Sequence, residues 1–127
     1  MFHVSRVLSA EMALALASTF YDLNPKPLGG AGKELAAKGK EIYEAGIPDK
    51  NVPACVSCHG NDAQGNGPFP RLAGQLPDYI SNKLTNWDKE RGQDPGDPDS
   101  STMMQPIARS LTDDQINAVA AYLSELE

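Results

Sequence analysis

Apolar residues recur along much of this chain at the three- and four-residue intervals of amphipathic helices. Before the C-terminal end, the stretches with this spacing are residues 11–20, 31–45 and 78–91. Ser9 precedes the first as a residue type that caps helices, and Pro77 precedes the third as one that suits a first helical turn. No stretch shows the alternation of a half-buried strand, so the pattern predicts an all-α fold.

The clearest helix start lies near the C-terminal end of the chain. Thr112 is a capping residue type, and Gln115 three positions later completes a capping box. Ile116, Val119 and Leu123 then recur on one face. The sequence therefore predicts a last helix that begins after Thr112 and buries this apolar face.

Glycine and proline divide the chain between the predicted helices. Residues 24–30 have the composition of a linker, and residues 60–74 and 92–101 have that of loops. A chain of 127 residues suits one hydrophobic core. We therefore expect a helical extension over residues 1–23, the linker, and one domain over residues 31–127.

The N-terminal extension resembles the C-terminal end of the chain at a constant offset, from Met1 to Met104. Identical pairs include Met1 with Met104, Arg6 with Arg109, Leu8 with Leu111, Ala15 with Ala118 and Ala17 with Ala120. This repeat indicates that residues 1–23 correspond to the tail of an earlier, related domain. The alternative is a chance similarity between two alanine-rich amphipathic helices.

The segment Cys55-Val56-Ser57-Cys58-His59 carries most of the chemical information. Two cysteines three positions apart, followed at once by histidine, form the attachment pattern for a covalent c-type haem. On one helical turn both sulfurs lie on the same face, where each can bond one vinyl group of a porphyrin. His59 is then placed to bind the iron.

Two other chemistries use closely spaced cysteines. A disulfide between Cys55 and Cys58 would need the βαβ surroundings of a thioredoxin-like site, and the sequence shows no strands there. A structural zinc site needs four ligands, and the one histidine besides His59 is His3. Haem attachment therefore remains the preferred interpretation.

The charge and hydropathy of the chain narrow the possible partners. The net charge is −6, and residues 77–127 hold ten acidic and four basic side chains, so we expect no nucleic acid partner. This acidic surface would either steer a basic protein partner or keep the chain soluble. No apolar run approaches about 20 residues, so no intrinsic membrane span is predicted. Residues 6–17 superficially resemble a signal peptide, but Glu11 interrupts them, and we do not interpret them as an export signal.

A histidine-ligated iron in an electron carrier needs a second strong ligand, and methionine sulfur is a common one. Met12 falls inside a predicted helix and is expected to fill the core. Met103 and Met104 are expected in a loop before the last helix, where a sulfur can reach the far side of a porphyrin. Spacing alone does not separate these two residues.

These segments together resemble a class I bacterial cytochrome c, in particular one haem domain of the two-haem cytochrome c4 group. The resemblance covers residues 32–126, and the motifs that carry it are Cys55 to His59, Phe69 to Gln75, Met103 with Met104, and Leu111 to Leu123. It implies a small fold of about four to five helices wrapped around one covalent haem c. A full member of that group carries two attachment motifs, whereas this sequence carries one.

The resemblance also implies roles for single residues. Met104 would be the second iron ligand, because it stands seven positions before Leu111. The carbonyl of Pro70 would accept a hydrogen bond from the ring of His59, and Leu72 would pack on the haem. By the same resemblance, the helix with Gly39 and Tyr43 would cross the last helix near Val119 and Tyr122.

The function implied is single-electron transfer without catalysis, and the chain is not expected to be an enzyme. The partners would be redox proteins, and the location would be the periplasm, where this family receives its haem. One alternative is an electron-entry or exit domain of a larger redox enzyme. A weaker alternative is a haem enzyme or gas sensor with an open iron position, for which neither methionine would bind the metal.

Overall fold

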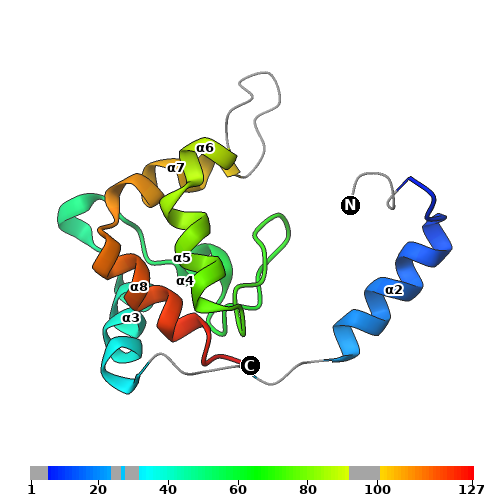
Figure 1. Cartoon of the computed structure of the whole chain (residues 1–127), viewed down its shortest axis with the longest axis horizontal. Helices are drawn as coiled ribbons and strands as arrows, with labels where there is room; N and C mark the ends of the chain where they lie inside the picture. The colour runs from blue at the N-terminus through cyan, green and yellow to red at the C-terminus, as the bar shows by residue number, and fades with distance from the viewer. Residues whose placement is uncertain (1–5, 24–26, 28–31, 92–100) are drawn as a thin grey trace.

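The computed structural model describes residues 6–23, 27, 32–91 and 101–127, and these residues form helices without strands (Figure 1). In chain order the helices are α2 (Ala10–Leu23), α3 (Lys33–Ala45), the 3-10 helix η1 (Pro48–Lys50), α4 (Val56–His59), α5 (Pro77–Thr85), α6 (Trp87–Glu90), α7 (Ser101–Ser110) and α8 (Asp113–Leu123). After residue 31, the helices longer than one turn are α3, α5, α7 and α8. This arrangement confirms the all-α prediction and the expected number of main helices.

Helices α3 and α8 form the central pair of the domain, and they cross where α3 carries a glycine. A Cβ atom on Gly39 would lie 1.9 Å from the carbonyl oxygen of Ala118 and 2.9 Å from the Cβ of Tyr122. The rings of Tyr43 and Tyr122 meet at 5.5 Å between centroids, within the range of favourable aromatic pairs. The predicted crossing is therefore present.

The core beneath this crossing joins α3, α5, α8 and the loop after α4. Its buried apolar residues are Tyr43, Ala63, Ala73, Ile80, Val119, Ala120 and Leu123. Partly buried side chains, among them Cys55, Leu72 and Leu84, pack against this cluster. The segment with the two cysteines is therefore part of the core.

Helix α8 begins with the predicted capping box. The hydroxyl of Thr112 accepts a hydrogen bond from the amide of Gln115 at 3.4 Å, and the side chain of Gln115 accepts one from the amide of Thr112 at 3.0 Å. Ile116, Val119 and Leu123 are all buried, as their spacing predicted. The sequence therefore predicted correctly both the start of this helix and the face that it buries.

Helix α2 stands apart from the other helices in Figure 1 and buries almost none of its surface. Ser9 caps it as predicted, since its hydroxyl accepts a hydrogen bond from the amide of Met12 at 3.2 Å. The expectation that Met12 fills the core is wrong, because its side chain is 52% exposed. The predicted linker over residues 24–30 lies outside the described residues except for Pro27, and Met1 and His3 also lie outside them.

The predicted single helix over residues 78–91 is interrupted at Asn86. Asn86 has φ −103° and ψ 16°, and its side-chain amide donates to the carbonyl of Asn82 at 3.1 Å. Asn86 is therefore both the last cap of α5 and the first cap of α6. The apolar stripe of Ile80, Leu84 and Trp87 survives the break: Ile80 is buried and the other two are half-buried.

The prediction that Met103 and Met104 lie in a loop is also wrong, because both lie in α7. Pro106 stands inside this helix, although a proline there removes one backbone hydrogen bond. The proline is tolerated on an exposed face, and the hydroxyl of Ser110 donates to its carbonyl at 2.8 Å.

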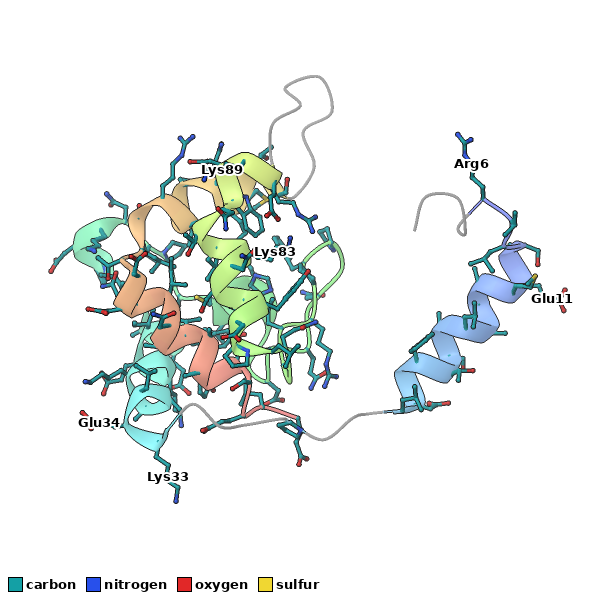
Figure 2. The ribbon with its side chains drawn as sticks, viewed as in Figure 1. Arg6, Glu11, Lys33, Glu34, Lys83 and Lys89 are labelled. Atoms are coloured by element: carbon teal, nitrogen blue, oxygen red, sulfur yellow. The ribbon has the colours of Figure 1, made fainter. Side chains whose placement is uncertain are left out.

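Across the described parts of the chain, no helix is long and apolar enough to cross a membrane. Charged side chains such as Lys33 and Glu34 on α3, and Lys83 on α5, lie at the surface (Figure 2).

Candidate functional site

The two cysteines and the histidine lie on one turn of helix, as their spacing predicted. The amides of Cys58 and His59 both donate to the carbonyl of Cys55, at 3.2 and 2.9 Å. Gly60 ends the turn with φ 84°, a conformation that favours glycine. Both sulfurs are therefore presented from a single rigid turn that also fixes the ring of His59.

The loop that follows folds back onto His59. The amide of Gly65 donates to the carbonyl of His59 at 2.9 Å, and a Cβ on Gly65 would lie 2.6 Å from the carbonyl oxygen of Phe69. This close approach needs a glycine, which is also the residue type suited to its φ of 83°. The edge of the Phe69 ring then faces the His59 ring at 6.2 Å between centroids.

This fold brings the carbonyl oxygen of Pro70 to 2.9 Å from Nδ1 of His59. A carbonyl only accepts, so Nδ1 carries the proton and Nε2 keeps its lone pair. Such a bond fixes the orientation of a ligating imidazole and makes it more basic. The hydrogen bond expected between these two residues is therefore present in the structure.

Nε2 of His59 is buried and has no hydrogen-bond partner among the described residues. The residue is only 4% exposed. A buried polar atom without a partner costs about 1–3 kcal/mol, so such atoms call for an explanation. Iron ligation by this nitrogen supplies one, and the residues present therefore fit a haem bonded beside His59.

Tyr43 supports the same turn from α3, a contact that the sequence did not predict. Its hydroxyl donates to the carbonyl of Gly60 at 2.7 Å, and its side chain is fully buried. Burial raises the pKa of this phenol well above its usual value, so it stays protonated and remains a donor. No local signal reveals a contact between residues so far apart in sequence, because it depends on how α3 crosses α8.

The two cysteines are not bonded to each other. Burial raises the pKa of the Cys55 thiol, whereas reactive dithiol sites lower the pKa of a cysteine to favour the thiolate. In the described ranges no group of three or more His, Cys, Asp or Glu side chains is arranged to hold a metal ion. The raised pKa of Cys55 disfavours the dithiol interpretation.

The structure places the remaining predicted residues as follows. Leu72, like Cys55, packs against the core cluster. On α7, Met104 is half-buried, and it lies one turn before the buried Ala108. Met103 is 55% exposed. The helix therefore directs Met104 towards the protein and Met103 towards solvent.

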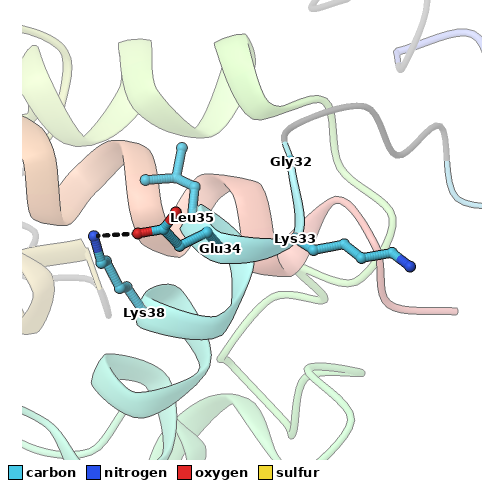
Figure 3. Close-up of a pocket in the computed structure, with 5 residues that line it drawn as sticks. All are labelled: Gly32, Lys33, Glu34, Leu35 and Lys38. Atoms are coloured by element: carbon cyan, nitrogen blue, oxygen red, sulfur yellow. Dashed lines mark hydrogen bonds and ion pairs between the residues drawn. The ribbon is translucent and has the colours of Figure 1, made fainter.

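A surface pocket of about 410 Å³ lies at the start of α3 (Figure 3). Its lining residues are Gly32, Lys33, Glu34, Leu35 and Lys38. Glu34 and Lys38 form an exposed ion pair at 3.3 Å across it. None of these residues belongs to the cysteine and histidine turn, and the pocket contributes no candidate chemistry.

Comparison with known proteins gives a consistent result. The family profile described as "Cytochrome c" matches residues 36–127. Cytochrome c-552 of Acidithiobacillus ferridurans is 39% identical over 99% of this chain and 52% of its own length, and cytochrome c4 of Thiocapsa roseopersicina is 38% identical over 94% and 61%. A thiosulfate dehydrogenase electron acceptor of Stutzerimonas stutzeri is 34% identical over 97% and 56%. The chain thus spans little more than half the length of these relatives.

Solved structures agree with the sequence comparison. Cytochrome c4 of Acidithiobacillus ferrooxidans superimposes with a TM-score of 0.75 at 40% identity, over 99% of this chain and 71% of that one. A thiosulfate dehydrogenase of Marichromatium purpuratum gives a TM-score of 0.62 at 29% identity, over 72% of this chain and 19% of that one. The same fold therefore occurs both in these cytochromes and as a part of a larger redox enzyme.

Proposed function

The chain belongs to the cytochrome c family, and from this we propose that it transfers single electrons through a haem iron held by His59 and Met104. It carries one covalent haem c, bonded through Cys55 and Cys58. The haem supplies an iron that cycles between the ferrous and ferric states. The protein's own residues hold that iron in place and set its surroundings.

The observation that carries this proposal is the state of His59. Its Nδ1 is held by the Pro70 carbonyl, and its Nε2 is buried with a free lone pair and no partner among the described residues. That is the arrangement expected of an axial ligand whose ring must not rotate. Hydrogen bonds from Tyr43 and Gly65 hold the backbone next to this ring. The position of the ring therefore changes little between redox states.

We propose Met104 as the second ligand because of its position in α7. It lies on the inward side of that helix, whereas Met103 projects outward. A thioether ligand raises the reduction potential relative to a second histidine. With both axial positions filled by protein, no substrate reaches the metal, which is the property of a carrier and not of an oxygen-activating enzyme or an open gas sensor.

The partners we propose are other redox proteins that dock briefly. Such encounters typically bury less than about 1,200 Å². One relative is named as the electron acceptor of thiosulfate dehydrogenase, which supports a redox enzyme as the donor. We place this exchange in the periplasm, where proteins of this family receive their haem.

A second candidate is a haem domain within a larger redox enzyme. The match to part of a thiosulfate dehydrogenase structure, of which this chain covers 19%, favours it. The chemistry at His59 and Met104 would be the same in both cases. The two candidate functions differ in whether the redox partner is bound permanently. The mass of the native protein distinguishes them, because a permanent partner would add to it.

We also propose that residues 31–127 form the haem domain and that residues 1–23 are an extension joined through residues 24–30. The extension would correspond to the last helix of a preceding cytochrome c domain. Helix α2 repeats the apolar spacing of α8 but leaves its apolar side chains in solvent, with Phe20 at 69% and Leu14 at 72% exposure. The match to the family profile begins only at residue 36.

Substitution of the two methionines tests the ligand proposal. Met104→Ala is expected to abolish the sulfur-to-iron absorption band of the oxidised protein and to allow the reduced form to bind carbon monoxide. Met104→His is expected to keep a low-spin iron and lower the potential by about 0.1 V or more, a fraction of the roughly 0.8 V range that axial ligands set. Met103→Ala is the matched control and should leave the band unchanged. Loss of the band in Met103→Ala alone would contradict the assignment.

A further inference from the structure

Three hydrogen bonds connect α7 to α6 across residues 91–100. The indole nitrogen of Trp87 donates to the carbonyl of Ser101 at 3.0 Å. The side-chain amide of Gln105 donates to one carboxylate oxygen of Asp88 at 2.9 Å, and Nε of Arg109 donates to the other at 2.6 Å. We call this set of five residues the α6–α7 clasp.

The three α7 members of the clasp lie four residues apart, at positions 101, 105 and 109. Residues with this spacing form one stripe along a helix. Because the three hydrogen bonds fall on that stripe, the clasp fixes the rotation of α7 about its own axis. A single contact would leave that rotation free.

Rotation of α7 decides which methionine faces the protein. Neighbouring residues on a helix point about 100° apart. With the clasp made, Met104 lies on the side of the buried Ala108, and Met103 is 55% exposed. A turn of one residue would exchange the two sulfurs.

We propose, on the basis of the ligand function argued above, that the α6–α7 clasp selects Met104 over Met103 as the iron ligand and keeps its sulfur in place. Asp88 is its central positioning residue, because it accepts two of the three hydrogen bonds. Tyr43 and Pro70 hold the ligand His59 in position, and the clasp holds the ligand Met104 in position. In this role Asp88 and Arg109 act through the orientation of α7.

The charges within the clasp agree with this assignment. The hydrogen bond from Arg109, together with that from Gln105, lowers the pKa of the Asp88 carboxyl, and the same contact raises the pKa of Arg109. The pair therefore stays ionised at neutral pH. Lys83 of α5 also pairs with Glu90 of α6, so α6 is joined to the helix before it as well as to α7.

The binding of imidazole to the oxidised haem protein tests the proposal. Imidazole competes with Met104 for the iron, so its apparent affinity reports the fraction of molecules in which the methionine bond is open. Asp88→Ala removes both acceptors, and because the pair is solvent-exposed we expect a rise in imidazole affinity of about fivefold. Trp87→Phe should change the affinity in the same direction.

Glu34→Ala is the matched control, because it removes one carboxylate from another exposed ion pair, on α3. It should leave the imidazole affinity unchanged. The Asp88→Ala protein should also show a second set of ligand-methionine signals in paramagnetic nuclear magnetic resonance spectra, and Met103→Leu added to it should remove them. Equal imidazole affinities and a single set of signals in the Asp88→Ala and Glu34→Ala proteins would overturn the proposal. The function itself would fail separately, if Met104→Ala kept the sulfur-to-iron band.

Discussion

At the scale of single residues, some contacts in the site could be predicted from the sequence and others could not. Cys55, Cys58 and His59 lie within five positions, so one helical turn brings them together and the motif alone predicted it. The hydrogen bond from His59 to Pro70 was expected through the family resemblance and is present. The contact of Tyr43 with Gly60 was not expected, because it joins two elements whose approach depends on the packing of the whole domain.

Gly39 offers the sharpest prediction at this scale. A methyl group there would meet the Ala118 carbonyl, which belongs to a helix backbone and has no freedom to rotate away. Gly39→Ala should therefore lower the free energy of unfolding by about 1–3 kcal/mol through overpacking, although alanine gains about 1 kcal/mol in helix propensity. Urea unfolding of the wild-type and Gly39→Ala haem proteins measures this change in the free energy of unfolding.

Lys40→Ala, on the exposed side of the same helix, is the control for this change and should stay within about 0.5 kcal/mol of the wild type. A Gly39→Ala protein as stable as the wild type would show that α3 and α8 do not meet as closely as described.

At the scale of elements, helix starts were more predictable than helix continuity. The helix caps and apolar stripes of the chain are local, so Ser9 and Thr112 marked the beginnings of α2 and α8 correctly. The break at Asn86 and the survival of α7 through Pro106 were missed. Asn86 forms a side-chain hydrogen bond to Asn82 that the spacing of apolar residues does not register. Pro106 lies on an exposed face, which depends on how α7 packs.

The cap of α8 gives a prediction for this scale. Thr112→Ala removes the hydroxyl that accepts from Gln115 and breaks one half of the capping box. The free energy of unfolding should fall by about 1 kcal/mol. Thr85→Ala, at an exposed position of α5, should change it by less than about 0.5 kcal/mol. An equal effect of both substitutions on the urea midpoint would mean that the capping box does not stabilise the fold.

At the scale of the whole molecule, the sequence anticipated one helical domain, and the fold confirms its class. The N-terminal side was predicted least well, because α2 exposes the apolar residues that were expected to be buried. The linker lies outside the described residues except for Pro27. An amphipathic pattern predicts that a face will be covered but does not say by what. That is why Met12 was expected inside the core and is found in solvent.

Shortening the chain tests the proposed division. A protein that starts at residue 31 should still incorporate haem, keep its potential, and unfold with a free energy within about 0.5 kcal/mol of the full chain, because α2 buries little of its surface. Full-length Phe20→Ser should behave in the same way. Loss of haem, or a much less stable domain after shortening, would show that residues 1–30 belong to the same folding unit.

The claim on which the rest depends is that a single haem is bonded to both cysteines of this chain. Intact mass under denaturing conditions, on protein matured with the periplasmic haem-attachment machinery, tests it most directly. We predict the mass of the polypeptide plus one haem, with no thiol of Cys55 or Cys58 left to react with an alkylating reagent. The mass of the bare polypeptide, carrying two alkyl groups, would contradict the account.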